Sequence, residues 1–152
     1  MAPPAPASGE ALQQVIDRLW ETVPPLWNHI RANVRGIASE CFEMSVPQFR
    51  ILRHIGSGVG SASALAALTQ TSAPAVSQCV DALVEKGLIT RRQSEQDRRC
   101  VDLALTPDGA DVLGVIFAEN RLWMEHKLAS LNPEEMGHIL RGLAALKDAF
   151  LT

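Results

Sequence analysis

Two short runs of alternating apolar and polar residues enclose a charged loop in the middle of this 152-residue chain. The second run, Val101–Leu105, alternates with the period of two that is typical of a β-strand. The loop between the runs, Ser94–Arg99, carries Arg98 and Arg99. Residues 88–106 are therefore predicted to form a β-hairpin with a basic tip, a shape suited to placing cations in a nucleic-acid groove.

Five capping side chains predict where helices begin. The side-chain oxygens of Ser, Thr and Asn accept the free backbone N–H groups of a helix's first turn, and proline is tolerated there because that position needs no donor. These signals predict helices that start just after Ser45, Ser61, Ser72, Thr106 and Asn132. The helix after Ser72 is predicted to end at Gly87. Its predicted buried stripe consists of Val76, Cys79, Val80 and Leu83.

The N-terminal region is predicted to be helical and interrupted. An apolar stripe over residues 9–23 has helical spacing. Pro24 and Pro25 are predicted to kink or restart this helix, because proline lacks the backbone donor and disfavours helix before it. A second helical run continues to about Cys41. Residues 1–8 are rich in Pro and Ala and are predicted to be disordered.

Charge is distributed unevenly along the chain, whose net charge is −3. Residues 46–106 carry seven Lys and Arg against five Asp and Glu, a net charge of +2, and the remainder carries −5. Local charge, rather than the total, governs attraction to a polyanion such as DNA. The hairpin and the helices just before it are therefore the part of the chain best suited to meet DNA, with a modest positive excess.

Several classes of protein are excluded by missing motifs. The sequence has no GxSxG, no Walker loop and no Cys/His arrangement, so an enzyme is not expected. Its four His residues form no HxxxH or HExxH pair, and we expect neither a metal nor a cofactor. The three Cys residues include no CxxC pair, and no apolar run has the length of a membrane span. We expect a cytoplasmic protein, associated with the nucleoid if it binds DNA.

The sequence resembles the MarR family of bacterial transcriptional regulators. The resemblance covers about residues 10–150 and is most specific where an Asp-Arg-Arg hairpin tip precedes Leu-x-Leu-Thr-x-x-Gly. The matching positions are Leu65-Ala66, Ser72, Val76-Ser77, Val80-Asp81-x-Leu83, Glu85-Lys86-Gly87-Leu88-Ile89, Arg91-Arg92, Asp97-Arg98-Arg99 and Leu103-x-Leu105-Thr106-x-x-Gly109.

This resemblance implies a fold class and a function. The fold would be mainly α with a small β-hairpin wing: a winged helix-turn-helix flanked by N- and C-terminal dimerisation helices. Residues 46–106 would form the DNA-binding region, and residues 9–45 with 107–152 the helical dimerisation region. The expected partners are pseudo-palindromic double-stranded DNA, a second copy of the chain and a small-molecule effector, with no membrane. A monomer whose terminal helices fold back over the middle module is the alternative to a homodimer.

The resemblance also implies which residues meet DNA. Arg99 would enter the minor groove, and Asp97 would orient the hairpin tip through a salt bridge. The expected DNA-binding residues are Ser61, Ser72, Ala73, Ala75, Ser77, Gln78, Arg91, Asp97, Arg98 and Arg99. The helix after Ser72 has no basic residue before Lys86, so the hairpin is predicted to supply a larger share of the affinity. Gln78 can bond an adenine edge through two hydrogen bonds.

Two polar residues depart from the family's usual apolar pattern. Thr69 and Thr71 occupy positions where relatives are usually apolar. Either local backbone hydrogen bonds satisfy the two hydroxyls, or the short helix is shifted by one residue.

An effector site is predicted from aromatic residues that lie near arginines. Relatives bind small aromatic or phenolic acids between the dimerisation helices and the DNA-binding module, and an arginine beside aromatic rings suits an aromatic carboxylate. The expected ligand-binding residues are Trp27, either His29 or Ile30, Phe49, Arg50, Arg53 and Trp123. Arg50 and Arg53 have an equally good interpretation as surface or phosphate-contacting groups.

Two other functions stay open. The first is a regulator of the same fold that senses oxidants through Cys41, Cys79 or Cys100, of which only Cys100 has cationic neighbours that favour a thiolate. The second is a winged-helix adaptor that docks proteins instead of DNA. The preferred function is a DNA-binding regulator, most often a repressor in this family, that a small ligand such as an aromatic acid releases.

Overall fold

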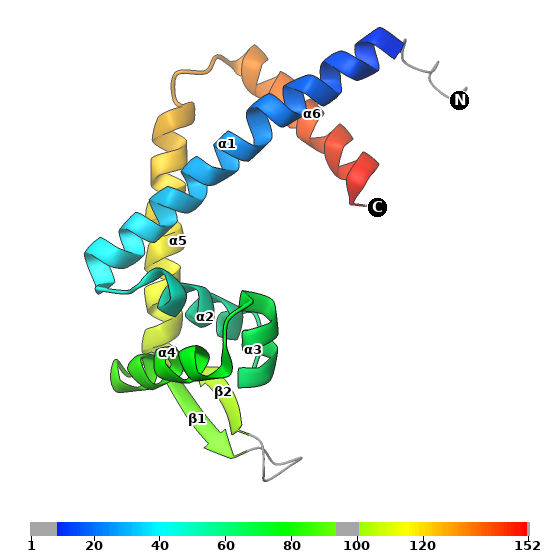
Figure 1. Ribbon diagram of the computed structural model, residues 1–152. Helices are drawn as coiled ribbons and strands as arrows, with labels where there is room; N and C mark the ends of the chain where they lie inside the picture. The colour runs from blue at the N-terminus through cyan, green and yellow to red at the C-terminus, as the bar shows by residue number, and fades with distance from the viewer. Residues whose placement is uncertain (1–8, 94–100, 152) are drawn as a thin grey trace. The chain divides into compact units, whose positions relative to one another are not determined.

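A computed structural model of the chain describes residues 9–93 and 101–151, which form six helices and one two-stranded sheet (Figure 1). The elements follow in the order α1 (Gly9–Phe42), α2 (Val46–Gly56), α3 (Ala62–Thr69), α4 (Ala73–Glu85), β1 (Ile89–Gln93), β2 (Val101–Leu105), α5 (Pro107–Leu128) and α6 (Pro133–Phe150). The predicted class, mainly α with a β-hairpin, is confirmed.

Helix α1 is one uninterrupted helix of 34 residues, so the predicted restart at Pro24 and Pro25 is wrong. Each proline removes one backbone donor, which leaves the carbonyls four residues earlier, at Trp20 and Glu21, without their helical partners. Both of these residues are exposed, so water can solvate the two carbonyls. Solvent exposure therefore allows a helix to continue through a pair of prolines that would stop it in a core.

The capping residues found in the sequence all open helices. Ser45 and Gln48 form a complete capping box at α2, and Asn132 and Glu135 form another at α6. Ser61 accepts from the Ala64 amide at α3, and Ser72 from the Ala75 amide at α4. These bonds are local, so the sequence alone was sufficient to predict them.

One hydrophobic core joins α2, α3, α4, the hairpin and the ends of α1 and α5 that adjoin them. Its fifteen buried apolar residues all lie between Ala38 and Ile116. Leu52, Leu65 and Leu83, from three successive helices, are completely inaccessible to solvent. Three of the four residues predicted for the buried face of α4 are buried, and Cys79 is half-buried at the edge of the core.

The hairpin is joined to the helices on both sides of it. Strands β1 and β2 pair antiparallel, with Ile89 opposite Leu105 and Gln93 opposite Val101. A short bridge between Ser61 and Asp102 adds the start of α3 to the sheet. Gly87 adopts φ +72° between α4 and β1, which fits its prediction as the residue that ends the helix.

The start of α5 packs directly against the backbone at the end of α4. The Thr106 hydroxyl donates to the Gly87 carbonyl and accepts from the Gly109 amide, which confirms Thr106 as a cap. A side chain at Gly109 would place its Cβ against the Leu88 carbonyl oxygen, well inside the distance that two such atoms can share. Glycine is therefore required at this position because α5 approaches the chain too closely for any side chain.

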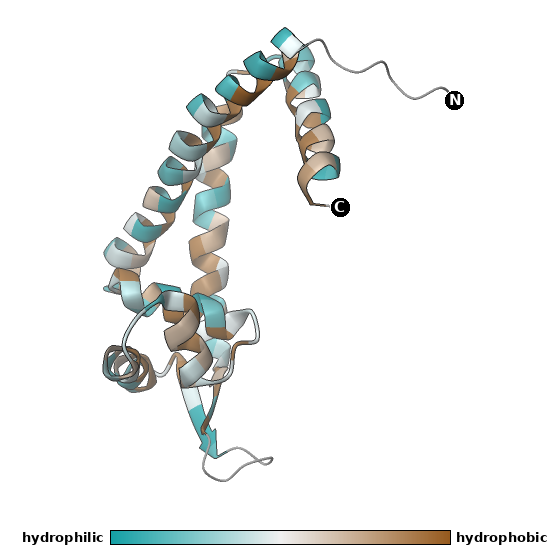
Figure 2. Cartoon of the chain, turned by 45° about the vertical axis from the view of Figure 1, so that its right-hand side comes forward, coloured by the Kyte–Doolittle hydropathy of each residue, from teal (hydrophilic) through white to brown (hydrophobic). Residues whose placement is uncertain are grey.

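The contacts within the described chain form two compact units, one up to Asn120 and one from Arg121 onward. The division falls inside α5 rather than at a linker. The second unit contains the end of α5 and all of α6, and α6 has no buried residue. Hydrophobic residues recur along α6 in Figure 2 and are exposed, notably Met136, Ile139, Leu140, Leu143 and Phe150.

Candidate functional site

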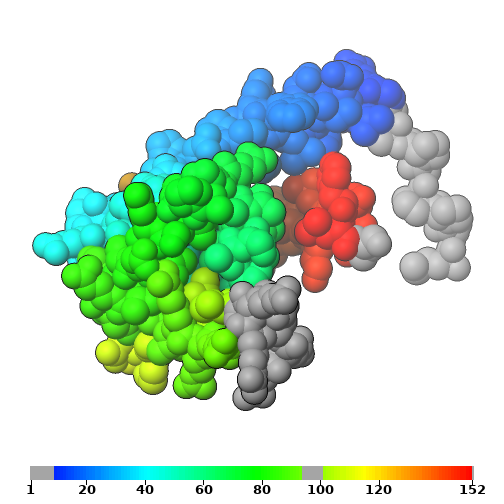
Figure 3. All heavy atoms as spheres, turned by 60° about the horizontal axis from the view of Figure 1, so that its bottom comes forward, coloured from blue at the N-terminus to red at the C-terminus, as the bar shows by residue number. Residues whose placement is uncertain are grey.

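Helix α4 has one buried face and one exposed polar face. Val76, Val80 and Leu83 point into the core, whereas Ser77 and Gln78 are exposed. Three further predicted DNA-binding residues lie at the start of α4. Ser72 and Ala73 are exposed, and Ala75 is half-buried. Figure 3 shows α4 and the hairpin on the same face of the molecule. The exposed side of α4 is therefore available to a ligand that meets this face.

Arg91 is positioned by an ion pair that the sequence analysis did not predict. Its guanidinium lies 2.6 Å from the carboxylate of Asp81, so β1 is tied to the middle of α4. Arg92, the next residue of β1, is exposed. The other predicted residues of the hairpin, namely Asp97, Arg98, Arg99 and Cys100, lie outside the described residues.

The turn between α3 and α4 is held by local polar contacts. The Thr69 hydroxyl donates to the Leu65 carbonyl at 2.7 Å, and the Thr71 hydroxyl donates to the Thr69 carbonyl at 3.1 Å. Gln70 adopts the left-handed conformation, with φ +53°, between the two helices. Of the two interpretations of these threonines, the first is therefore confirmed: backbone carbonyls satisfy their hydroxyls.

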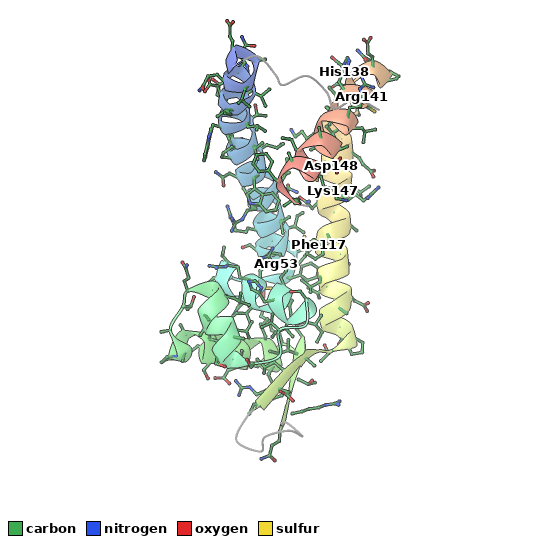
Figure 4. All side chains as sticks on the ribbon, turned by 90° about the vertical axis from the view of Figure 1, so that its right-hand side faces the viewer. Arg53, Phe117, His138, Arg141, Lys147 and Asp148 are labelled. Atoms are coloured by element: carbon green, nitrogen blue, oxygen red, sulfur yellow. The ribbon has the colours of Figure 1, made fainter. Side chains whose placement is uncertain are left out.

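A cavity of about 250 Å³ lies beside this module, between α1, α2 and the middle of α5. Figure 4 labels Arg53 of α2 and Phe117 of α5, two of the residues that line it. Its apolar lining is Trp27, Ile30, Val34, Val46, Phe49 and Phe117, and its polar lining is Arg31, Arg35, Arg50, Arg53 and Asn120.

Most of the predicted ligand-binding residues line this cavity. They are Trp27, Ile30, Phe49, Arg50 and Arg53. The remaining one, Trp123, is not part of the lining, and its ring instead lies 5.9 Å from the ammonium of Lys127, four residues later in α5. The prediction for Trp123 rested on its chemistry alone, since neither sequence spacing nor any motif placed it near Phe49.

Sequence reasoning missed two arginines of the cavity. Arg31 and Arg35 follow Trp27 at intervals of four residues, which places the three side chains on one face of α1. This spacing was a usable signal. With Arg50 and Arg53, four guanidinium groups line the cavity and no carboxylate does. None of the four forms an ion pair within residues 9–93 and 101–151.

Two titratable side chains near these surfaces favour their neutral forms. Partial burial, and then the positive charges of Arg53 and Arg50, lower the pKa of His54. His54 does not line the cavity, whose charged residues are the four arginines. Burial raises the pKa of the Cys79 thiol, which makes this cysteine a poor thiolate and a poor sensor of oxidants. The described ranges contain no group of three or more His, Cys, Asp or Glu residues that could hold a metal ion.

The described residues thus define a winged helix-turn-helix: α3 and α4 joined by a short turn, with a hairpin that follows α4. A family model described as the MarR family matches residues 42–99. The chain is 29% identical over 108 residues to the uncharacterised helix-turn-helix regulator YfiV of Bacillus subtilis, an alignment that spans 70% of this chain and 68% of YfiV. It is 34% identical over 85 residues to the transcriptional repressor MdtR of Bacillus subtilis, across 54% of this chain and 55% of MdtR.

A solved structure shares the fold over nearly the whole length. A mutant of MepR from S. aureus, solved bound to an oligodeoxyribonucleotide, superposes with a TM-score of 0.65 at 18% identity, covering 95% of this chain and 99% of that one. Residues 42–99 thus match the MarR family of transcriptional regulators, the family that the sequence resembles. The expectation that it is not an enzyme is confirmed with the family. No helix among the described residues combines the length and the apolar character that a membrane span requires.

Proposed function

We propose that this protein is a sequence-specific regulator that reads double-stranded DNA with α4 and the hairpin. The observation that carries the proposal is the exposed polar face of α4, where Ser77 and Gln78 stand opposite the buried Val76 and Val80. A helix with a core on one side and free hydrogen-bonding groups on the other is suited to the major groove. The MepR mutant of the same fold, solved bound to an oligodeoxyribonucleotide, supports DNA as the ligand.

The polar face of α4 offers hydrogen bonds but little charge. We infer that Ser61, Ser72, Ala73, Ala75, Ser77 and Gln78 position and read DNA, and that Arg98 and Arg99 supply most of the electrostatic attraction. Arg91 contributes less, because Asp81 already neutralises part of its charge. Asp97 is proposed to orient the hairpin tip.

The shares of α4 and of the hairpin in the DNA-binding affinity can be measured. DNA selected by the wild-type protein from a random pool would be titrated with Arg99→Ala and Gln78→Ala at several salt concentrations. Arg99→Ala should weaken binding more and reduce the slope of log K against log salt by about one. A much larger loss for Gln78→Ala would contradict the proposed share of the hairpin. Absence of any DNA binding at low salt would favour the adaptor.

We further propose a homodimer formed through residues 9–45 and 107–152. Leu12, Val15 and Trp20 of α1 and Leu140 and Leu143 of α6 are more than half exposed. Exposed apolar rows on two helices are typical of surfaces that a second copy covers, and two-fold symmetry is the commonest closed arrangement. Sedimentation velocity should give a dimer for the wild type, whereas Leu140→Asp with Leu143→Asp should shift it toward monomer. A monomeric wild type at micromolar concentration would contradict the proposal.

The proposed mode of control is repression that an anionic effector relieves. The name of MdtR supports the repressor part. The cavity supports the effector part, because it combines aromatic Trp27 and Phe49 with four guanidinium groups that have no ion-pair partner among the described residues, the pairing that an aromatic carboxylate requires. Benzoate and phenolic acids should bind the protein and weaken its complex with the selected DNA. A series of such acids that changes neither tryptophan fluorescence nor DNA affinity would contradict the effector role.

A further inference from the structure

Arg50 connects the cavity to the turn of the helix-turn-helix. Its side chain lines the cavity, and its Nη2 atom donates to the backbone carbonyl of Thr69, the last residue of α3, at 3.3 Å. Only Gln70, Thr71 and Ser72 separate this carbonyl from α4, and Ser72 caps α4. Of the four arginines around the cavity, Arg50 alone makes such a hydrogen bond to the helix-turn-helix within the described ranges.

The contact is electrostatic as well as geometric. The C-terminal end of a helix carries a partial negative charge on carbonyls that lack helical partners, and a nearby cation stabilises it. The Arg50 guanidinium supplies that cation to α3 from α2. The bond, at 3.3 Å, is slightly longer than the usual range for N–H···O contacts, so a competing anion could replace it at small cost.

We propose that Arg50 is the positioning residue through which an anion in the cavity displaces α4 from its DNA-reading position. This proposal rests on the effector role of the cavity. An anion paired with Arg50 neutralises the charge that stabilises the end of α3, and it also lies close enough to that end to be repelled by it. The anion therefore binds more tightly when the Thr69 carbonyl has moved away, and by linkage it weakens the conformation that binds DNA by the same factor.

Arg53 provides a matched control on the same helix. It lines the same cavity with the same chemistry, one helical turn from Arg50, but it makes no such hydrogen bond to the α3–α4 turn in the part of the chain that the structure describes. Removing either charge should weaken anion binding. Only removal of Arg50 should disconnect anion binding from DNA binding.

The decisive experiment compares wild type, Arg50→Gln and Arg53→Gln with benzoate as the probe and neutral benzamide as its uncharged control. Calorimetry gives benzoate affinity, and fluorescence anisotropy gives affinity for the selected DNA with and without saturating benzoate. Benzoate should weaken wild-type DNA binding about fivefold or more, a typical coupling factor, and benzamide should not. Arg53→Gln should bind benzoate less tightly but keep the coupling factor at saturation. Arg50→Gln should bind benzoate with a coupling factor near one.

A second measurement needs no effector. Native-state hydrogen exchange should show faster exchange of the Gln70 and Thr71 amides, which bond to carbonyls of α3, in Arg50→Gln but not in Arg53→Gln. Two results would overturn the role of Arg50 and leave the effector role intact. They are a wild-type coupling factor between benzoate and DNA in Arg50→Gln, and equal exchange of the Gln70 and Thr71 amides in the two variants. Failure of benzoate to bind the wild type would overturn the effector role and the proposal together, so the two failures are distinguishable.

Discussion

Helices α2 and α6 have similar amphipathic patterns, but the apolar face is buried in α2 and exposed in α6. In α2, Phe49, Leu52 and Ile55 are all buried in the core. In α6, Met136, Ile139 and Leu143 have the same kind of spacing and are all exposed. An apolar stripe thus predicts that one face of a helix will be covered. Which element covers that face depends on residues that are distant in the sequence.

The largest expected loss of stability comes from truncating a buried side chain of the core. Leu52→Ala should lower the free energy of unfolding by about 2–5 kcal/mol, because it removes a fully buried side chain and leaves a cavity. Leu140→Ala in α6, at a residue 69% exposed, should change it by less than about 0.5 kcal/mol in dilute protein. Urea unfolding at two protein concentrations measures both. Equal losses for the two variants at low concentration would contradict the contrast between the regions.

Substituting alanine for each of two glycines of α5 compares a packed position with an open one. Gly109→Ala should destabilise by about 1–3 kcal/mol or more, because its Cβ would collide with the backbone of Leu88. Gly114→Ala meets nothing within 4 Å and should stabilise by about 0.5–1 kcal/mol, since alanine favours a helix. Thermal unfolding would compare the pair. A neutral Gly109→Ala would mean that α5 does not approach Leu88 as closely as described.

A lysine at the end of α4 should matter more than one in α6. The Lys86 ammonium donates to the carbonyls of Phe42 and Glu43, both at 3.1 Å, and so caps the end of α1. Lys86→Met should cost about 1 kcal/mol, less than is usual for hydrogen bonds from a charged donor, because both bonds are exposed to water. Lys147→Met in α6, which removes an exposed lysine from a helix without buried residues, should stay within about 0.5 kcal/mol. Indistinguishable denaturation midpoints would show that the Lys86 contacts contribute nothing.

The smallest effect is expected from the ion pairs. Both Asp81–Arg91, which joins α4 to β1, and Arg121–Glu125, within α5, are substantially exposed. Double-mutant cycles should give about 0.2–1 kcal/mol for each pair. Both coupling energies should shrink at high salt because the charges are screened. A coupling energy for Asp81–Arg91 that salt leaves unchanged would indicate a pair less exposed than described.

The features that the sequence predicted well are local ones. Caps such as Ser45 and Asn132 depend on residues three positions away, and the hairpin depends on a period of two. The features that were missed are decided by distant partners. Asp81 meets Arg91 across α4 and β1, Lys86 reaches Phe42, and Trp123 does not join the residues that line the cavity.

The order of the elements that follow α1, the starts of α2 to α6, the buried face of α4 and the resemblance to the MarR family could all be read from the sequence. This was possible because capping, strand alternation and helical spacing act over a few residues. Three features became apparent in the folded chain alone: α1 continues through its prolines, four arginines line one cavity, and Arg50 reaches Thr69. These outcomes depend on solvent exposure and on which helices approach one another, and neither is encoded in any short segment.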